Sequence, residues 1–167
     1  DLALNSGIPA VVLSPTVYLE NIRLPGYMPG LHDQGYISYP PLSPGRRFSF
    51  TTHRDQARLA AAALDRPDLH GELIQIATPD PVTGEEFAAL LTPWFGRTIR
   101  YRHLTPEEYG RRAAAAIKSP SAAEAMAAMW RDIDRLPPEA TAIETAPLEA
   151  RFGVRLSPIA DHLREWP

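Results

Sequence analysis

The segment from Leu13 to Asn21, LSPTVYLEN, carries side chains that could bind a ligand. It follows the apolar run IPAVV and combines a proline, an aromatic ring and an adjacent Glu-Asn pair. Pro15 fixes the direction of the chain at the carboxyl end of the expected strand, which is where ligands bind in open α/β sheets. The segment is therefore the first candidate for a binding site.

Metal and thiol chemistry find little support in the sequence. The chain has no cysteine, which excludes disulfides and thiolate metal sites and makes a cytoplasmic location the default expectation. No two histidines stand at metal-ligand spacing, so we expect no metal site. The five histidines are His32, His53, His70, His103 and His162.

The acidic residues are typical of helix starts rather than of a catalytic carboxylate pair. Asp55 precedes an Ala-rich run, where it is expected to accept backbone N–H bonds and complement the helix dipole. His53 beside it is expected on the surface or in a loop. Four glutamates form two first-turn pairs on separate helices, where caps and solvated faces are expected: Glu85, Glu86, Glu107 and Glu108.

Length and charge narrow the class of protein. The 167 residues suffice for one domain with a core, and 44% of them are apolar. The net charge of −3 and the scattered basic residues argue against a nucleic-acid surface. No apolar run approaches the ~18 residues that a membrane helix needs.

Hydrophobic patterns and turn residues predict alternating strands and helices. Thr83 with Glu86 and Thr105 with Glu108 each form a capping box that should open a helix. The helix after Thr83 should stop at Gly96, although Pro93 could kink it or end it earlier. Strands are expected at 9–13, 36–39, 47–51, 72–78 and 98–104, and helices at 16–23, 52–64, 84–95, 106–136 (broken near 119–120) and 157–165.

This alternation predicts the α/β class, but with features of an incomplete sheet. There are too few units for a doubly wound sheet, and the glycine fingerprint G-x-G-x-x-G is absent, so the usual phosphate-binding turn cannot form here. Residues 1–6 resemble the last turns of a helix closed by Gly7. We therefore expect the chain to be part of a longer protein that lacks its N-terminal βαβ units here.

The order of motifs resembles the C-terminal half of NmrA-like proteins, which are atypical short-chain dehydrogenase/reductase relatives. The matching pieces are SGIPAVVLSPTVYLENI, FSFTTHRDQARLAAAAL, GELIQIATPDPVTGEEFAALLTPWFGRTIRYRHLTPEEY and APLEARFGVRLSPIADHL. This chain departs from the family pattern at Ser14 (usually Arg), at Gln56 (usually Val or Ile) and at Pro79-Asp80 (usually Gly-Pro). The resemblance implies the C-terminal part of a Rossmann-like NAD(P)-binding fold with a small substrate-side α/β subdomain.

The resemblance also implies positions for a cofactor. Pro15, Thr16 and Val17 would lie under the nicotinamide ring through backbone contacts, with Tyr18 close by. The structural alternative is a strand-to-helix turn with Tyr18 in the core. Asn21 would orient this loop or contact substrate, and its alternative is a hydrogen bond to backbone.

The same resemblance places a substrate cleft beside residues 106–136. Tyr109 and Trp130 would line it, with Met126 and Met129, although helical spacing is equally typical of core positions. Tyr27 and Met28, in the preceding Pro/Gly loop, are further expected cleft residues.

These observations predict the substrate-side portion of an NAD(P)-dependent oxidoreductase, with residues 1–24 as the last Rossmann strand region and residues 25–167 as the substrate-side subdomain. In the complete protein, NADPH would pass a hydride to a small carbonyl or quinone-like acceptor; this fragment alone should bind no cofactor. The alternatives are a non-catalytic NAD(P) sensor that binds a protein partner and a free-standing interaction domain. We also expect residues 8–14 to be covered by the absent half or by a second copy.

Overall fold

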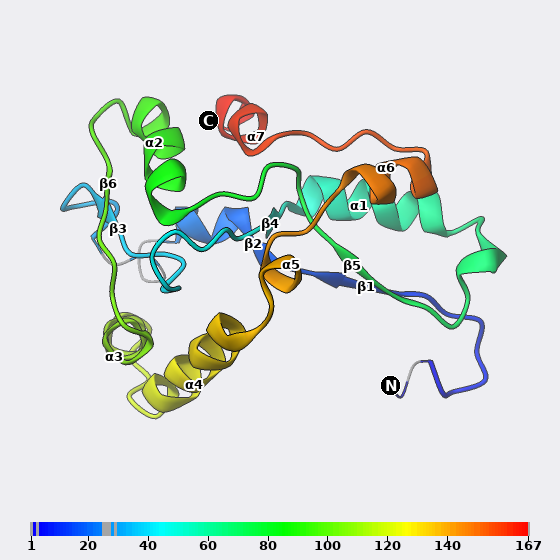
Figure 1. Ribbon diagram of the computed structural model, residues 1–167, viewed down its shortest axis with the longest axis horizontal. Coiled ribbons are helices and arrows are strands. Elements are labelled where there is room, and N and C mark those ends of the chain that lie inside the picture. Colours follow the sequence, from blue (N-terminus) through cyan, green and yellow to red (C-terminus); the bar gives the residue numbers. More distant parts are fainter. Residues whose placement is uncertain (1, 3, 25–27, 29, 167) are drawn as a thin grey trace.

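The computed structural model describes residues 2, 4–24, 28 and 30–166, and it confirms the α/β class (Figure 1). Its strands form three parallel pairs, β1 with β5, β2 with β4 and β3 with β6. The strands are β1 (Val12–Pro15), β2 (Val17–Tyr18), β3 (Tyr36–Ile37), β4 (Phe50–Thr51), β5 (Leu73–Ile76) and β6 (Arg100–Tyr101). β1 and β2 follow each other with only Thr16 between them, so the chain passes directly from one pair to the next.

Helices α1 and α2 lie in the connections between strands, and five further helices of the described chain follow β6. The helices are α1 (His53–Ala63), α2 (Gly84–Phe95), α3 (Pro106–Ala116), α4 (Ala122–Arg135), α5 (Pro138–Thr141), α6 (Ala146–Phe152) and α7 (Ile159–Glu165), with short 3-10 turns η1 (Leu19–Arg23) and η2 (Pro67–Leu69). Helices α5 and α6 lie outside the predicted helices, and α6 ends at Gly153 (φ 64°) in a left-handed cap. The helix expected at 16–23 is wrong in part, because this segment forms β2 and then the 3-10 turn η1. None of the helices in the described part of the chain is both long and apolar enough to traverse a bilayer.

Both predicted capping boxes are present. The Thr83 hydroxyl accepts from the Glu86 N–H at 3.2 Å, and the Glu86 carboxylate accepts from the Thr83 N–H at 3.0 Å. Thr105 and Glu108 repeat the arrangement at the start of α3. Pro93 lies inside α2, yet the helix continues to Phe95 and ends at Gly96 in a left-handed conformation (φ 62°).

Two groups of buried apolar side chains hold these elements together. The larger one joins η1, β3, β4, α2, α3, α4 and α7. The smaller one lies between the β1–β5 pair and helices α1 and α6, which sit on the same side of that pair (Figure 1). Leu59 and Ile76 are fully buried at its centre. The core therefore has two parts. β1 packs against the smaller part, and β2, directly after it, packs against the larger part.

Helices cover the β1–β5 pair more completely on one face than on the other. In its register Leu13 lies opposite Ile74 and Val12 opposite Leu73. Ile74 is buried beneath the helices, whereas Leu73 is 59% exposed. Val11, Val12 and Leu13 are only partly buried by the rest of the chain, and β1 bonds to β5 alone among the described strands.

Partly exposed apolar residues on an open strand edge predict a covering partner for residues 8–14. The Val12 N–H already bonds to the Glu72 carbonyl at 2.9 Å, and successive amides of a strand point to opposite edges, so the Leu13 N–H faces the open edge. We expect the Leu13 amide to exchange slowly with solvent in the complete protein, because a further strand or a second copy pairs with this edge. Hydrogen exchange followed by mass spectrometry measures this. Fast exchange at Leu13, beside slow exchange at Val12 in the same sample, would show that the edge stays open.

The second prediction concerns the pH dependence of the first capping box. The backbone N–H of Thr83, and then the Arg47 guanidinium, lower the pKa of Glu86 below its ordinary value of 4.5. A carboxylate whose folded pKa is lowered stabilises the fold above its unfolded pKa, and this contribution is lost as the pH falls through the folded pKa. Glu86→Gln should therefore lower the free energy of unfolding at pH 7, by a small amount because the side chain is half exposed.

Urea unfolding between pH 3 and pH 7 gives this comparison. The difference between wild type and Glu86→Gln should shrink as the pH falls through the acidic range. Glu144→Gln, at an exposed position outside any helix, serves as the matched control. A difference of the same size at every pH would assign the effect to packing instead of charge.

Candidate functional site

The segment after β1 is held in place by a buried hydroxyl. Thr51 Oγ1 donates to the carbonyl of Ile76 at 3.0 Å and accepts from the Thr16 N–H at 3.0 Å. Its single proton is committed to Ile76, so the Thr16 hydroxyl, 2.8 Å away, is the donor in their bond. The Thr16 N–H also lies 3.3 Å from the Ile76 carbonyl. Thr16 is therefore engaged on both its amide and its hydroxyl, and its N–H is not open to a ligand.

Tyr18 is oriented by the first turn of α1. Its hydroxyl donates to Gln56 Oε1 at 2.7 Å, and its ring lies 4.5 Å from the His53 ring, centroid to centroid. Glu20 accepts from the His53 backbone N–H at 2.9 Å and lies 3.7 Å from Nδ1 of the same residue. His53 is exposed, as predicted. Tyr18 itself is half-buried, so it is not a core residue.

A cavity of about 230 Å³ adjoins this segment. Its lining comes from β2, η1, Tyr39 in the loop after β3, and the α3–α4 pair. The lining residues are Val17, Tyr18, Asn21, Tyr39, Tyr109, Met126, Met129 and Trp130. The structure thus brings together two of the predicted cofactor residues, Val17 and Tyr18, with three of the predicted substrate residues, Asn21, Tyr109 and Trp130.

The other predicted site residues lie elsewhere. Pro15 and Thr16 precede the cavity at the end of β1 and are not part of its lining. Tyr27 lies outside the residues that the structure describes. Met28 is buried, and it borders a different hollow. Within the described ranges no backbone group hydrogen-bonds the Asn21 side chain, so the structural alternative for Asn21 gains no support.

Three aromatic rings make the inner wall of the cavity. Trp130 stands edge-to-face with Tyr39 (5.3 Å) and with Tyr109 (6.1 Å), and all three are almost fully buried. Tyr109 and Trp130 therefore belong to the core and also line the cavity, so the two alternatives for them are compatible. Tyr39 was missed; its only sequence signal was an aromatic at the end of the predicted strand 36–39.

The lining determines what the cavity can accept. None of its eight described side chains is charged, and its polar groups are the Asn21 amide, three phenols and the Trp130 indole N–H. Aromatic rings and thioethers favour flat, apolar groups, with a few polar contacts to orient them. Among the described residues no cluster of three or more His, Asp or Glu side chains has metal-binding geometry.

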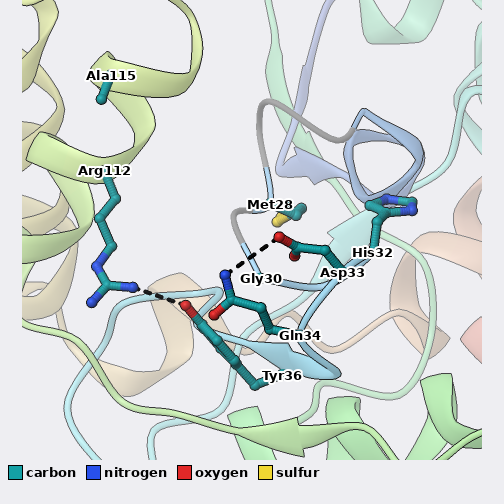
Figure 2. Close-up of a pocket in the computed structure, with 8 residues that line it drawn as sticks. All are labelled: Met28, Gly30, His32, Asp33, Gln34, Tyr36, Arg112 and Ala115. Atoms are coloured by element: carbon teal, nitrogen blue, oxygen red, sulfur yellow. Dashed lines mark hydrogen bonds between the residues drawn. The ribbon is translucent and has the colours of Figure 1, made fainter.

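A second hollow, of about 500 Å³, lies between the loop at residues 30–36 and helix α3 (Figure 2). Figure 2 shows Arg112 reaching across it to the Tyr36 hydroxyl, at 2.8 Å, and Gln34 donating to Asp33 at 3.3 Å. Asp33 and Gln34 are exposed, so this is a polar surface hollow rather than an enclosed site. Of the described residues that were predicted to line the cofactor or substrate site, only Met28 borders it.

Asp55 has a structural role, as predicted, but with different partners. The capping residue is Thr52, which accepts from the Asp55 N–H at 3.1 Å. The Asp55 side chain is fully buried, where Oδ2 accepts from the Thr78 hydroxyl and lies 3.1 Å from His162 Nε2. Asp55 therefore ties α1 to α7 and to the loop after β5, instead of capping its own helix.

Comparisons with known proteins point to reductases. No protein-family model matches the chain. It is 29% identical over 103 residues to an NAD(P)H azoreductase of Xenophilus azovorans and 31% identical over 104 residues to an agroclavine dehydrogenase of Claviceps fusiformis. These matches cover 62% and 61% of this chain and 35% of each relative, so the chain spans about a third of their length.

Solved structures share the fold over almost the whole chain. A nucleoside-diphosphate-sugar epimerase of Staphylococcus aureus matches 98% of this chain and 55% of its own, with a TM-score of 0.74 at 21% identity. A Citrobacter triphenylmethane reductase complexed with NADP(H) matches 96% of this chain and 54% of its own, with a TM-score of 0.68 at 20% identity. The predicted fold and the predicted resemblance to atypical short-chain dehydrogenase/reductase proteins are confirmed.

The third prediction concerns the buried Asp55. Asp55→Ala should lower the free energy of unfolding by about 2–3 kcal/mol, more than the ~1 kcal/mol of a lost cap, because His162 and Thr78 lose a buried partner. Turnover per folded molecule should stay unchanged. Urea unfolding measures the first quantity, with the exposed Asp65→Ala as control. A loss no larger than that of the control would contradict the buried network, and a stable but inactive variant would contradict the structural role.

Proposed function

We propose that this chain, as a relative of atypical short-chain dehydrogenase/reductase proteins, forms the substrate-side portion of an NAD(P)H-dependent reductase. The acceptor we propose is a small, uncharged carbonyl or quinone-like compound. The observation that carries the proposal is the 230 Å³ cavity, which adjoins the carboxyl end of the first parallel strands and is lined by aromatic and thioether side chains.

The position of the cavity supports a cofactor on one side and an acceptor on the other. Parallel α/β sheets bind ligands beyond the carboxyl ends of their strands, and Pro15 and Val17 lie at that edge. The side chains of Pro15 and Val17 would offer apolar contact to a nicotinamide ring. Because the Thr16 N–H is already bonded, contacts there would come from carbonyls and side chains. When bound, the dinucleotide supplies the hydride.

Within the cavity the protein's own side chains would orient the acceptor. Tyr109 and Trp130 offer ring surface for stacking, and the Asn21 amide offers a donor for a carbonyl oxygen. Trp130 and Tyr109 are almost fully buried, so packing holds this wall in place. We favour NADPH over NADH, in line with the NADP(H) named for the Citrobacter reductase and the NADPH named for an Escherichia coli quinone oxidoreductase that shares the fold (TM-score 0.68, 22% identity).

A non-catalytic NAD(P) sensor is the second candidate. The observation that favours it is the absence of a charged side chain from the described lining of the cavity, which leaves no strong acid or base beside the acceptor. A sensor would bind the dinucleotide and leave quinones unreduced. The two candidates therefore differ in turnover, not in binding.

The fourth prediction tests the reductase directly. The complete protein should bind NADPH and oxidise it, followed at 340 nm, when a small quinone is added, while residues 1–167 alone should show no micromolar binding by calorimetry. Binding by the complete protein without turnover would favour the sensor. Micromolar binding by the fragment alone would contradict the expectation that the phosphate-binding turn lies outside this chain.

A variant that fills the cavity localises the acceptor. Met129, partly exposed at the cavity rim, should tolerate Met129→Trp, which would raise the KM for the quinone about ten-fold and leave the Kd for NADPH unchanged. Leu64→Trp, at an exposed position after α1, is the matched control. Equal effects of the two variants would place the acceptor outside this cavity.

A further inference from the structure

Tyr18 is held in one orientation by groups from another element of the fold. We propose that Gln56 is a positioning residue that fixes the Tyr18 phenol in the wall of the cavity, and that Tyr18 is not the proton donor of the reaction. This inference rests on the reductase proposed above.

The hydrogen bond between the two side chains is short and directional. Tyr18 Oη donates to Gln56 Oε1 at 2.7 Å, which is the usual length for a strong hydroxyl bond. A phenol has one proton, so this bond uses the only proton that Tyr18 could pass to an acceptor. The hydroxyl of Tyr18 thus fixes the orientation of its side chain, and its ring forms part of the cavity surface.

The remaining contacts of Tyr18 fix its ring. The imidazole of His53 packs on it at 4.5 Å with an interplanar angle of 47°, and Glu20 holds the His53 backbone N–H at 2.9 Å. Gln56 and His53 stand three positions apart in α1, so they lie on the same side of the helix, facing Tyr18. Tyr18 is therefore held at its hydroxyl by one α1 residue and across its ring by the other.

The residue type at position 56 makes this arrangement possible. An apolar side chain there could not accept the phenol proton, and Tyr18 would be free to turn toward the acceptor. Gln56 is half-buried in the first turn of α1, and its own backbone N–H bonds to Thr52 O at 2.9 Å. The acceptor oxygen is thus delivered from a rigid helical position.

This arrangement constrains the chemistry of a carbonyl acceptor. Its reduction forms a C–H bond from the hydride and an O–H bond from a proton. With the Tyr18 proton committed to Gln56, we assign the proton to water that enters the partly open cavity. Replacing Tyr18 by Phe should then disturb the fit of the acceptor without removing the proton source.

A double-mutant cycle in the complete protein tests the assignment. Tyr18→Phe and Gln56→Leu should each raise the KM for a small quinone about five-fold, the factor expected for one neutral hydrogen bond, with kcat changed less than two-fold. The double variant should show no further loss, since both changes remove the same bond. Gln56→Glu, which keeps an acceptor oxygen, should restore most of the wild-type KM.

Three results would overturn the proposal. A kcat lowered a hundred-fold by Tyr18→Phe but not by Gln56→Leu would make Tyr18 the proton donor. Additive losses in the double variant would show that Gln56 does not act through Tyr18. An equal loss in Gln34→Leu, a change of the same type at the exposed second hollow, would show that the effect is unspecific.

Failure of the proposed reductase would be seen separately, as a wild-type protein that binds NADPH without turnover. In that case the wild type, Tyr18→Phe, Gln56→Leu and the double variant are compared by their Kd for NADPH, because Tyr18 borders the proposed cofactor edge. Non-additive changes in Kd would support Gln56 as the residue that positions Tyr18. Additive changes would contradict it.

Discussion

Three hydrogen bonds meet at the buried hydroxyl of Thr51, and the arrangement of the site depends on them. Thr51 belongs to β4, its acceptor Ile76 ends β5, and its donor Thr16 lies between β1 and β2. One side chain therefore joins the two parallel pairs at the point where the chain passes from β1 to β2. A fully buried hydroxyl is costly to leave unpaired, so these bonds fix the backbone geometry where the chain passes from β1 to β2.

Helix α1 begins two residues after Thr51, so the hydrogen bonds of Thr51 also position the start of α1 beside the site. The Thr52 cap, the buried Asp55 and the Tyr18 partner Gln56 all belong to the first turn or its immediate continuation. Because β4 is paired in parallel with β2, the first turn of α1 is placed beside Tyr18. Asp55 then binds the same turn to α7 through His162. The position of Tyr18 is thus determined both by the pairing of β2 with β4 and by the contact of α1 with α7.

The opposite wall of the cavity belongs to the α3–α4 pair. These helices pack closely at Gly110, where a Cβ would lie 2.4 Å from the Ala123 carbonyl oxygen, so any larger residue would push the pair apart. That close approach lets Tyr109 and Trp130 meet Tyr39 in one aromatic group. The cavity is consequently bounded by β2 and η1 on one side and by the α3–α4 pair on the other.

The local elements could be read from the sequence because their causes are local. Both capping boxes, the end of α2 at Gly96 and the break before α4 follow from residues within one helical turn of each other. The resemblance to reductases likewise rested on short motifs in order, and it pointed to Val17, Tyr18, Asn21, Tyr109 and Trp130 before their proximity was known. The division of these residues between cofactor and substrate roles stays a prediction.

Only the tertiary structure decided which distant groups meet. Asp55 has the sequence position of a helix-start acid, but its partner His162 is 107 residues away, and no local signal pairs them. The same holds for Thr51 with Thr16, for Gln56 with Tyr18 and for Tyr39 in the aromatic wall. Sequence periodicity reports which face of an element is apolar, whereas hydrogen bonds between elements depend on strand register and helix placement, which are set by the packing of the whole chain.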